Sequence, residues 1–115
     1  MPELFQKALS AYTIMWLYVM FDLPVETKRQ RKNAADFRKN LLKDGFIMHQ
    51  FSVYIRPCAS LEAAQVHVRR IKLFVPEEGL VSILKVTDKQ FGDTIHLTGR
   101  KRQPPRHTPV QLELF

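Results

Sequence analysis

An unbroken apolar run near the start of the chain does most to limit the folds that it can adopt. Residues 17–21 read Leu-Tyr-Val-Met-Phe, and a run without polar alternation predicts a buried strand, here at about 14–21. Asp22 and Pro24 end this run. Residues 28–32, Lys-Arg-Gln-Arg-Lys, then open a cationic helix, so a buried strand is followed directly by a helix.

The first helix carries signals at both of its ends. Thr27 is the expected N-cap and Gln30 is its capping-box partner. Gly45 suits the position that follows a helix ending at about residue 43. The buried stripe of this helix is predicted to consist of Ala34, Phe37, Leu41 and Leu42.

Further strands and a second helix follow. Strands are predicted at 46–49 and at 51–56, where Pro57 ends the second, and later at 80–86, with a short fifth strand at 95–97. Ser60 is the expected N-cap of the second helix, which runs to about residue 75 before Pro76. Its inward stripe is predicted to be Ala64, Val68, Ile71 and Val75.

The order of these elements predicts an α+β fold. A βαββαβ order is that of the ferredoxin-like fold, with an antiparallel sheet and both helices on one face, here with an extra C-terminal strand. We expect an N-terminal extension at 1–13, the ferredoxin-like domain at 14–98 and a basic tail at 99–115. The helix-free face needs cover, and a homodimer that stacks two sheets provides it. The candidates for that face are Tyr18, Met20, Met48 and Tyr54.

The charge of the chain points to a polyanionic partner, either a nucleic acid or an acidic membrane surface. The formal net charge is +7, and the first helix holds seven cations against one acid, Asp36. The alternative is that these cations form only a solvated face. If the helix binds double-stranded DNA, its contacts should be to phosphates and independent of sequence. The predicted contacts are Arg29, Arg31, Lys32, Arg38 and Lys39, and Arg69, Arg70 and Lys72 on the second helix are weaker candidates.

Other classes of protein are disfavoured. No apolar run reaches the ~18 residues of a membrane span, and Glu3 stands where a signal peptide would be basic. Cys58 is the single cysteine, which excludes an intrachain disulfide and favours the reducing cytoplasm. The cysteine and the four histidines lack metal-ligand spacing, so zinc is not expected, and His67 is predicted to be a surface or edge residue.

Asp22 is the candidate catalytic residue and metal ligand. A carboxylate at the end of a strand, beside many cations, would suit Mg²⁺ bound to a phosphodiester. One carboxylate is a poor site on its own, but a two-fold axis could bring together Asp22 from both protomers. The alternative is an aspartate that caps the turn between strand and helix.

Several stretches together resemble one known family. Phe-Asp-Leu-Pro at 21–24, Lys-Asp-Gly-Phe at 43–46 and His-Gln-Phe-Ser-Val-Tyr at 49–54 are similar to the small CRISPR-associated adaptation proteins of the Cas2 family, and Thr-Asp-Lys-Gln-Phe-Gly at 87–92 resembles type II members. The resemblance implies a ferredoxin-like homodimer at the centre of the integrase complex that inserts new spacers. It also implies Mg²⁺-dependent endonuclease activity with Asp22 as the metal ligand. Residues 1–13 precede the resemblance, as an extension, an alternative start or a remnant of cloning.

Three functions therefore follow in order of preference. The first is a dimeric scaffold that binds duplex DNA with the CRISPR integrase. The second is a Mg²⁺-dependent endonuclease that cuts RNA or DNA through Asp22. The third is a toxin-like ribonuclease of the same fold that acts alone.

The end of the chain is apolar again after a basic, proline-containing stretch. The preferred use of this segment is strand addition to the integrase. The alternatives are docking into the bacterial sliding clamp and packing on its own sheet. The clamp hypothesis rests on a resemblance of residues 111–115 to the Gln-Leu-x-Leu-Phe peptide that bacterial proteins insert into the clamp. The predicted partner-binding residues are Gln111, Leu112, Leu114 and Phe115.

Overall fold

β1 is the strand around which the sheet is built. The computed structural model describes residues 13–99, and within them β1 (Met15–Asp22) pairs antiparallel with β3 (Val53–Cys58) on one side and β4 (Leu80–Thr87) on the other. β2 (Ile47–Gln50) pairs with β3, which gives the strand order β2-β3-β1-β4. The unbroken apolar run thus occupies a central strand, as its composition predicted.

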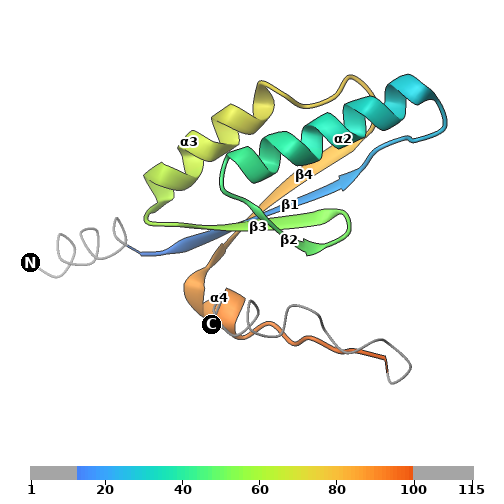
Figure 1. The fold of residues 1–115 in the computed structure, drawn as a ribbon. Coiled ribbons are helices and arrows are strands. Elements are labelled where there is room, and N and C mark those ends of the chain that lie inside the picture. Colours follow the sequence, from blue (N-terminus) through green and yellow to red (C-terminus); the bar gives the residue numbers. More distant parts are fainter. Residues whose placement is uncertain (1–12, 100–115) are drawn as a thin grey trace, which may run out of the picture.

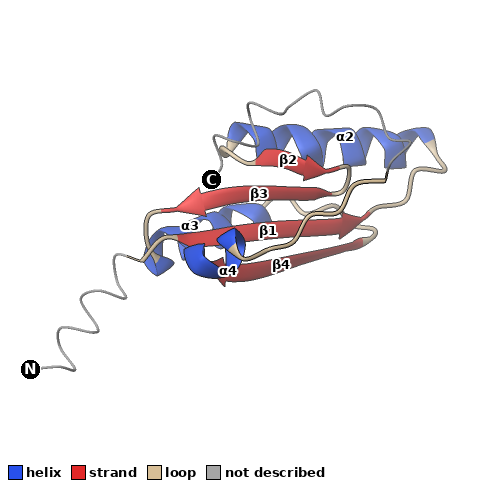
Figure 2. Ribbon diagram, turned by 90° about the horizontal axis from the view of Figure 1, so that it is seen from below, coloured by secondary structure: helices blue, strands red, loops and turns tan. Residues whose placement is uncertain are grey.

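The two long helices form a second layer on one face of this sheet. Figures 1 and 2 show α2 (Lys28–Lys43) and α3 (Leu61–Lys72) on that face, and the short α4 (Asp88–Gly92) on the other. This is the α+β, ferredoxin-like arrangement predicted from the sequence.

The predicted N-caps of α2 and α3 and the predicted C-terminal end of α2 are confirmed. The Thr27 hydroxyl accepts from the backbone N–H of Gln30 at 3.1 Å, and the Gln30 side chain accepts from that of Thr27 at 3.0 Å. Ser60 accepts from the N–H of Ala63 at 3.1 Å. After α2, Gly45 adopts a φ of 89°, a backbone conformation that few other residues tolerate.

The main core lies between the sheet and the two helices. Leu17, Val19 and Phe21 of β1 point into it, and Phe37 and Leu41 of α2 meet them there. The expected fourth residue of the α2 stripe is wrong, because Leu42 is 53% exposed. In α3, Ala64 and Ile71 are buried and Val68 packs against them, as predicted.

The helix-free face carries a smaller apolar cluster. Trp16 and Tyr18 of β1 lie on this face, where Phe91 of α4 stacks on Trp16 with 3.7 Å between ring centroids. Met20 shares the face by strand alternation. Two predicted members are wrong: Tyr54 is buried in the main core, and Met48 pairs with it across the sheet and so points the same way.

Two predicted boundaries and one predicted strand are also wrong. Pro57 lies inside β3. Ile55 pairs with Ile47, the first residue of β2, so Pro57 lies past the end of β2. Because no β2 residue stands opposite Pro57, the missing N–H of the proline breaks no hydrogen bond to β2. α3 ends at Lys72, and Val75 is 42% exposed. Residues 95–97 lie in an irregular stretch after α4 and form no strand in the described structure.

The predicted extension and most of the predicted tail lie outside the described residues, and so does the docking peptide with Gln111, Leu112, Leu114 and Phe115. Those assignments stay predictions. Within residues 13–99, no helix combines the length and the apolar character that crossing a membrane requires.

Candidate nucleic-acid interface

The outer surface of α2 presents cations to solvent. Four of them are exposed and make no hydrogen bond or ion pair within residues 13–99. Positions 28 and 29 belong to the first turn, and 39 and 43 to the second half of the helix. The charge therefore extends along the whole helix, and its bearers are Lys28, Arg29, Lys39 and Lys43.

The other three cations of α2 have local partners. Arg31 donates to the backbone carbonyls of Val25 and Glu26 at 3.1 and 3.0 Å. Lys32 forms an ion pair with Asp36 at 2.7 Å, and its hydrogen bond lowers the pKa of that carboxyl. Arg38 is half-buried against aromatic rings. The five predicted phosphate contacts therefore divide into two unengaged cations, Arg29 and Lys39, and three engaged ones.

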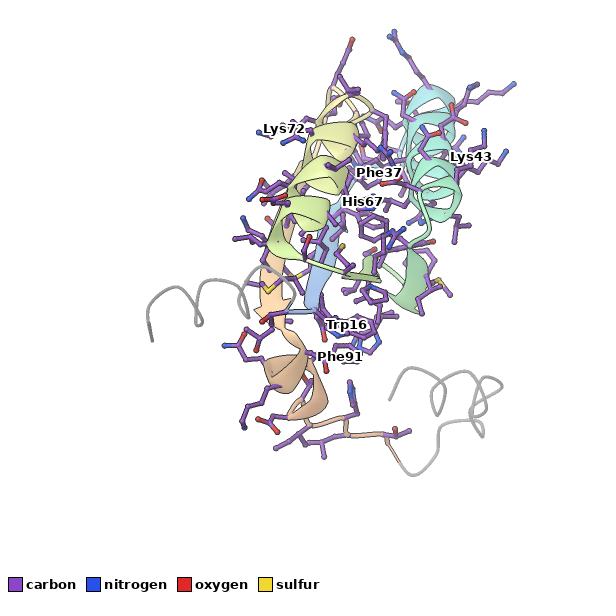
Figure 3. All side chains as sticks on the ribbon, turned by 90° about the vertical axis from the view of Figure 1, so that its left-hand side faces the viewer. Trp16, Phe37, Lys43, His67, Lys72 and Phe91 are labelled. Carbon is purple, nitrogen blue, oxygen red and sulfur yellow. The ribbon has the colours of Figure 1, made fainter. Side chains whose placement is uncertain are left out.

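α3 adds a second edge of positive charge. Arg69 and Lys72 are exposed and have no hydrogen bond or ion pair in the described part of the chain. Figure 3 shows Lys43 and Lys72 on the outer sides of α2 and α3, whereas Phe37 and His67 lie between the helices and the sheet. Both helices thus bury their apolar sides and leave cations outside.

Asp44, the C-cap of α2, joins the two helices. Its carboxylate lies 2.7 Å from Nδ1 of His67 and accepts from the Arg70 guanidinium at 2.8 Å. Its backbone carbonyl accepts from Nε of Arg56 at 2.9 Å. His67 is 8% exposed, so its prediction as a surface residue is wrong. Arg70 is engaged in this cluster and is a weaker candidate for phosphate than its neighbours.

Asp22 lies at the exposed end of β1. Its carboxylate accepts no hydrogen bond in the described structure, so nothing supports the turn-capping alternative, and Thr27 caps α2 instead. Strand alternation places the Asp22 side chain on the face of Trp16 and Tyr18, opposite the helices. Asp22 and the cationic helix, which were expected side by side, therefore lie on different faces of the sheet.

The backbone at Asp22 is tightly held. Leu80 pairs with it in β4, and Gly79 precedes Leu80 with a φ of 100°. A Cβ at Gly79 would lie 2.7 Å from the carbonyl oxygen of Asp22. This close approach fixes the position of the Asp22 backbone, and therefore the point from which the Asp22 side chain extends.

The donor set for a metal is small in one protomer. Residues 13–99 contain no group of three or more His, Cys, Asp or Glu side chains that could hold a metal ion. Mg²⁺ commonly takes one or two protein carboxylates and completes its shell with water and phosphate oxygens. One exposed carboxylate such as Asp22 fits that pattern only with further ligands from substrate or from a second copy.

A pair of histidines occupies the helix-free face. The rings of His49 and His96 lie 5.3 Å apart, and Tyr18 meets His49 edge-on at 6.0 Å. Burial lowers the pKa of His49 below its usual 6.5, and the neighbouring His96 lowers it further. Burial likewise raises the pKa of the Cys58 thiol, which disfavours its reactive thiolate form.

Similarity to known proteins identifies the family of this chain. Residues 15–94 match the family described as CRISPR associated protein Cas2. The chain belongs to the Cas2 family. A relative from Parvibaculum lavamentivorans, named CRISPR-associated endoribonuclease Cas2, is 54% identical over 101 residues, which are 88% of this chain and all of the relative. A relative of the same name from Flavobacterium psychrophilum is 50% identical over 93% of each chain.

A solved crystal structure of a Cas2 protein shares the fold. It is 26% identical, with a TM-score of 0.56, and the match covers 82% of this chain and 97% of the other. The Cas2 match spans β1 to α4, and so includes Asp22 and the whole of α2. The family resemblance inferred from the sequence motifs is confirmed.

The sequence reasoning missed α4, although Thr87 and Gln90 form its capping box, and it missed two features of the candidate site. One is the Asp44–His67 pair, whose partners are 23 positions apart and which no spacing pattern signals. The other is Phe51, predicted as part of a strand but in fact 74% exposed in the turn between β2 and β3. A sequence signal did exist for Phe51, because it follows a hydrophilic Gln50 at the point where a hairpin must turn.

Proposed function

We propose that this Cas2 family member acts in spacer acquisition as a dimeric scaffold that binds duplex DNA together with the CRISPR integrase. The observation that carries the proposal is the set of exposed, unengaged cations on α2 and α3. Such charges make no hydrogen bond or ion pair among the described residues, and a phosphate backbone is a natural partner for them. The relevant side chains are Lys28, Arg29, Lys39, Lys43, Arg69 and Lys72.

Duplex binding of this kind is independent of sequence. Contacts from lysine and arginine to phosphates position a protein on DNA but do not distinguish bases. A protein that captures new spacers has to accept any incoming sequence, so this property matches the role.

A matched pair of charge reversals tests the interface. Lys39→Glu on α2 should weaken every duplex alike and reduce the salt slope of binding by about one unit for each phosphate that is no longer neutralised. Lys89→Glu makes the same change of charge on α4, across the sheet from α2, and should change affinity far less. Fluorescence anisotropy over a range of salt concentrations measures both. Equal effects of the two variants would contradict a binding surface on α2.

The dimer proposal rests on the helix-free face of the sheet. Tyr18, Met20 and Leu84 belong to it, and Leu84 is 48% exposed. A second copy stacked on this face would remove that apolar surface from water, with exchange of the last strands as one way to complete the pairing. Light scattering at micromolar concentration should give the mass of two chains, and a monomer would contradict the proposal.

A second candidate function is a metal-dependent phosphodiesterase at Asp22. The specific observation in its favour is an exposed carboxylate without a hydrogen-bond partner among the described residues, in a family whose relatives are named endoribonucleases. Asp22 would hold Mg²⁺ with substrate oxygens, and Asp22 of a second copy would supply a further carboxylate across a two-fold axis. The bound ion would neutralise charge that develops on the cleaved phosphate.

Asp22→Asn separates the two functions, because it removes the charge and keeps the shape of the side chain. Cleavage of RNA and DNA with Mg²⁺ should be lost, whereas dimerisation, duplex binding and integration in a complex reconstituted with the integrase should persist. Loss of integration with a folded Asp22→Asn would show that the carboxylate serves acquisition itself.

The C-terminal tail is proposed to bind a partner. The preferred mode is strand addition to the integrase, and the alternative is docking into the bacterial sliding clamp. The residues proposed to make the contact are Gln111, Leu112, Leu114 and Phe115. A synthetic peptide of residues 109–115 can be titrated against both purified proteins. Binding to neither, with full integration after truncation before residue 109, would leave the tail without this role.

A further inference from the structure

Phe51 is an aromatic side chain presented to solvent on a fixed turn. It is 74% exposed and lies between β2 and β3. The turn is attached to the central strand, because the N–H of Phe21 donates to the carbonyl of Ser52 at 3.0 Å. The next residue, Val53, pairs with Met20. A large apolar ring is therefore held in water by a backbone that has little freedom to withdraw it.

The Arg38 guanidinium braces this ring from the side of α2. Its central carbon lies 4.6 Å from the centroid of Phe51 and 5.4 Å from that of Phe21. Both distances are within the range of a cation–π contact. Nε of Arg38 is buried and has no hydrogen-bond partner among the described residues, so stacking, not hydrogen bonding, positions this side of the guanidinium.

We propose that Phe51, positioned by Arg38, is a stacking site for an unpaired base of a single-stranded nucleic acid. The contact with Arg38 occupies part of the ring and leaves most of its surface open to water. An exposed aromatic ring beside positive charge is the usual construction of such a site. The ring stacks with any base, and the cations hold the adjoining phosphates.

The surroundings favour a nucleic acid over a protein partner. Phe51 meets a residue of α2, the helix that presents Lys39 and Lys43 to solvent. It is therefore on the helix side of the sheet, away from the face proposed to meet a second copy. The inference deepens the proposed nucleic-acid binding and depends on it. It adds a place where a strand that leaves a duplex could be held.

Arg38 is a positioning residue in this site and not mainly a phosphate contact. A lysine at this position would keep the charge but lose the planar group that contacts both rings. Arg38→Lys should therefore weaken single-strand binding without changing its salt slope, and should leave duplex affinity near that of the wild type. If Arg38 had a merely structural role, Arg38→Lys would instead weaken the binding of the single strand and of the duplex together.

Anisotropy titrations of the full chain with two probes test the proposal. The probes are an oligothymidylate of about 15 nucleotides and a blunt duplex, each over a range of salt concentrations. Phe51→Ala and Phe51→Leu should weaken oligothymidylate binding by about tenfold or more, since a stacked base typically contributes that much, and Phe51→Trp should restore it. Duplex affinity should stay within about twofold and both salt slopes should be unchanged, because no charge is altered.

Leu73→Ala is the matched control, because Leu73 is an 87% exposed apolar residue at the end of α3. It should change neither titration. Full oligothymidylate affinity in Phe51→Leu would overturn the proposal, since an aliphatic side chain would then suffice. Full affinity in Phe51→Ala, with loss of the dimer by light scattering, would also overturn it and make the ring a protein contact. If the wild type binds the duplex and not the oligothymidylate, only this inference fails; if it binds neither, the proposed function fails with it.

Discussion

The carboxylate of Asp44 lies 2.7 Å from Nδ1 of His67 and ties the C-terminal end of α2 to the middle of α3. The two side chains are 11% and 10% exposed, so water replaces little of the contact when it is broken. Arg70 completes the cluster from a more exposed position. One aspartate thus adds a polar link between the two cationic helices, which also share the main core.

Asp44→Ala should therefore lower the free energy of unfolding by about 2–3 kcal/mol. The substitution leaves a nearly buried imidazole without its partner and removes a charge-assisted hydrogen bond. Asp36→Ala, which breaks an exposed ion pair within α2, should have a much smaller effect. Urea denaturation of both variants measures the difference. Similar midpoints for the two would contradict a structural role for Asp44.

Gly79→Ala should destabilise the protein by about 2 kcal/mol or more. The new Cβ would lie 2.7 Å from the Asp22 carbonyl oxygen at a φ of 100°, so both sterics and backbone strain oppose it. Gly92→Ala is the control, because nothing lies within 4 Å of that position, and it should change stability by about 1 kcal/mol at most. Thermal unfolding compares them, and a neutral Gly79→Ala would show that the Asp22 backbone can move.

His49 makes stability depend on pH. The pKa of His49 is lowered in the folded state, so the unfolded chain binds its proton first as pH falls through about 6.5. Stability contributed by neutral His49 is present above this pH and is lost below it. The wild type should lose more stability between pH 7.5 and pH 5 than His49→Gln does, as measured by urea midpoints. Parallel losses in the two proteins would assign the pH dependence to other groups.

The helix-free face can be tested with a matched pair of lysines. Leu84→Lys places a charge on each copy within the proposed interface and should convert the dimer into monomers at micromolar concentration. Leu73→Lys makes the same change at an 87% exposed position outside that face and should leave the dimer intact. Light scattering gives both masses. A dimer that survives Leu84→Lys uses a different surface.

Local signals made most of the fold predictable. The capping box at Thr27 and Gln30, the Ser60 cap and Gly45 all act through neighbours a few residues away, so the sequence displays them directly. The two long helices and the four strands follow from these signals together with apolar periodicity, whereas the short α4 was not predicted. Pro57 was wrongly predicted to end β3. A strand tolerates a proline where no neighbouring strand needs its N–H, and here that depends on where β2 begins, which only the strand register determines.

The candidate site was less predictable because it depends on tertiary contacts. The sequence identified the cations of α2, but not which ones are engaged: Arg31 bonds to a preceding loop, and Arg38 packs on rings from a strand and a separate turn. The sequence also placed Asp22 beside the cations, since adjacency along the chain does not reveal the side of a sheet. His67 was assigned to the surface for the same reason, as its partner is distant in sequence.

The stack of Trp16 on Phe91 gives this protein an intrinsic optical reporter. Trp16 is the single tryptophan of the chain, and its indole N–H donates to Asp88 at 2.7 Å while its ring lies nearly parallel to Phe91, at 7°. Both partners belong to α4. Any event that lifts α4 from the sheet would expose the indole to water and shift its emission to longer wavelengths. Assembly on the helix-free face that displaces α4 can therefore be followed in unlabelled protein, from a fluorophore that the fold already positions there.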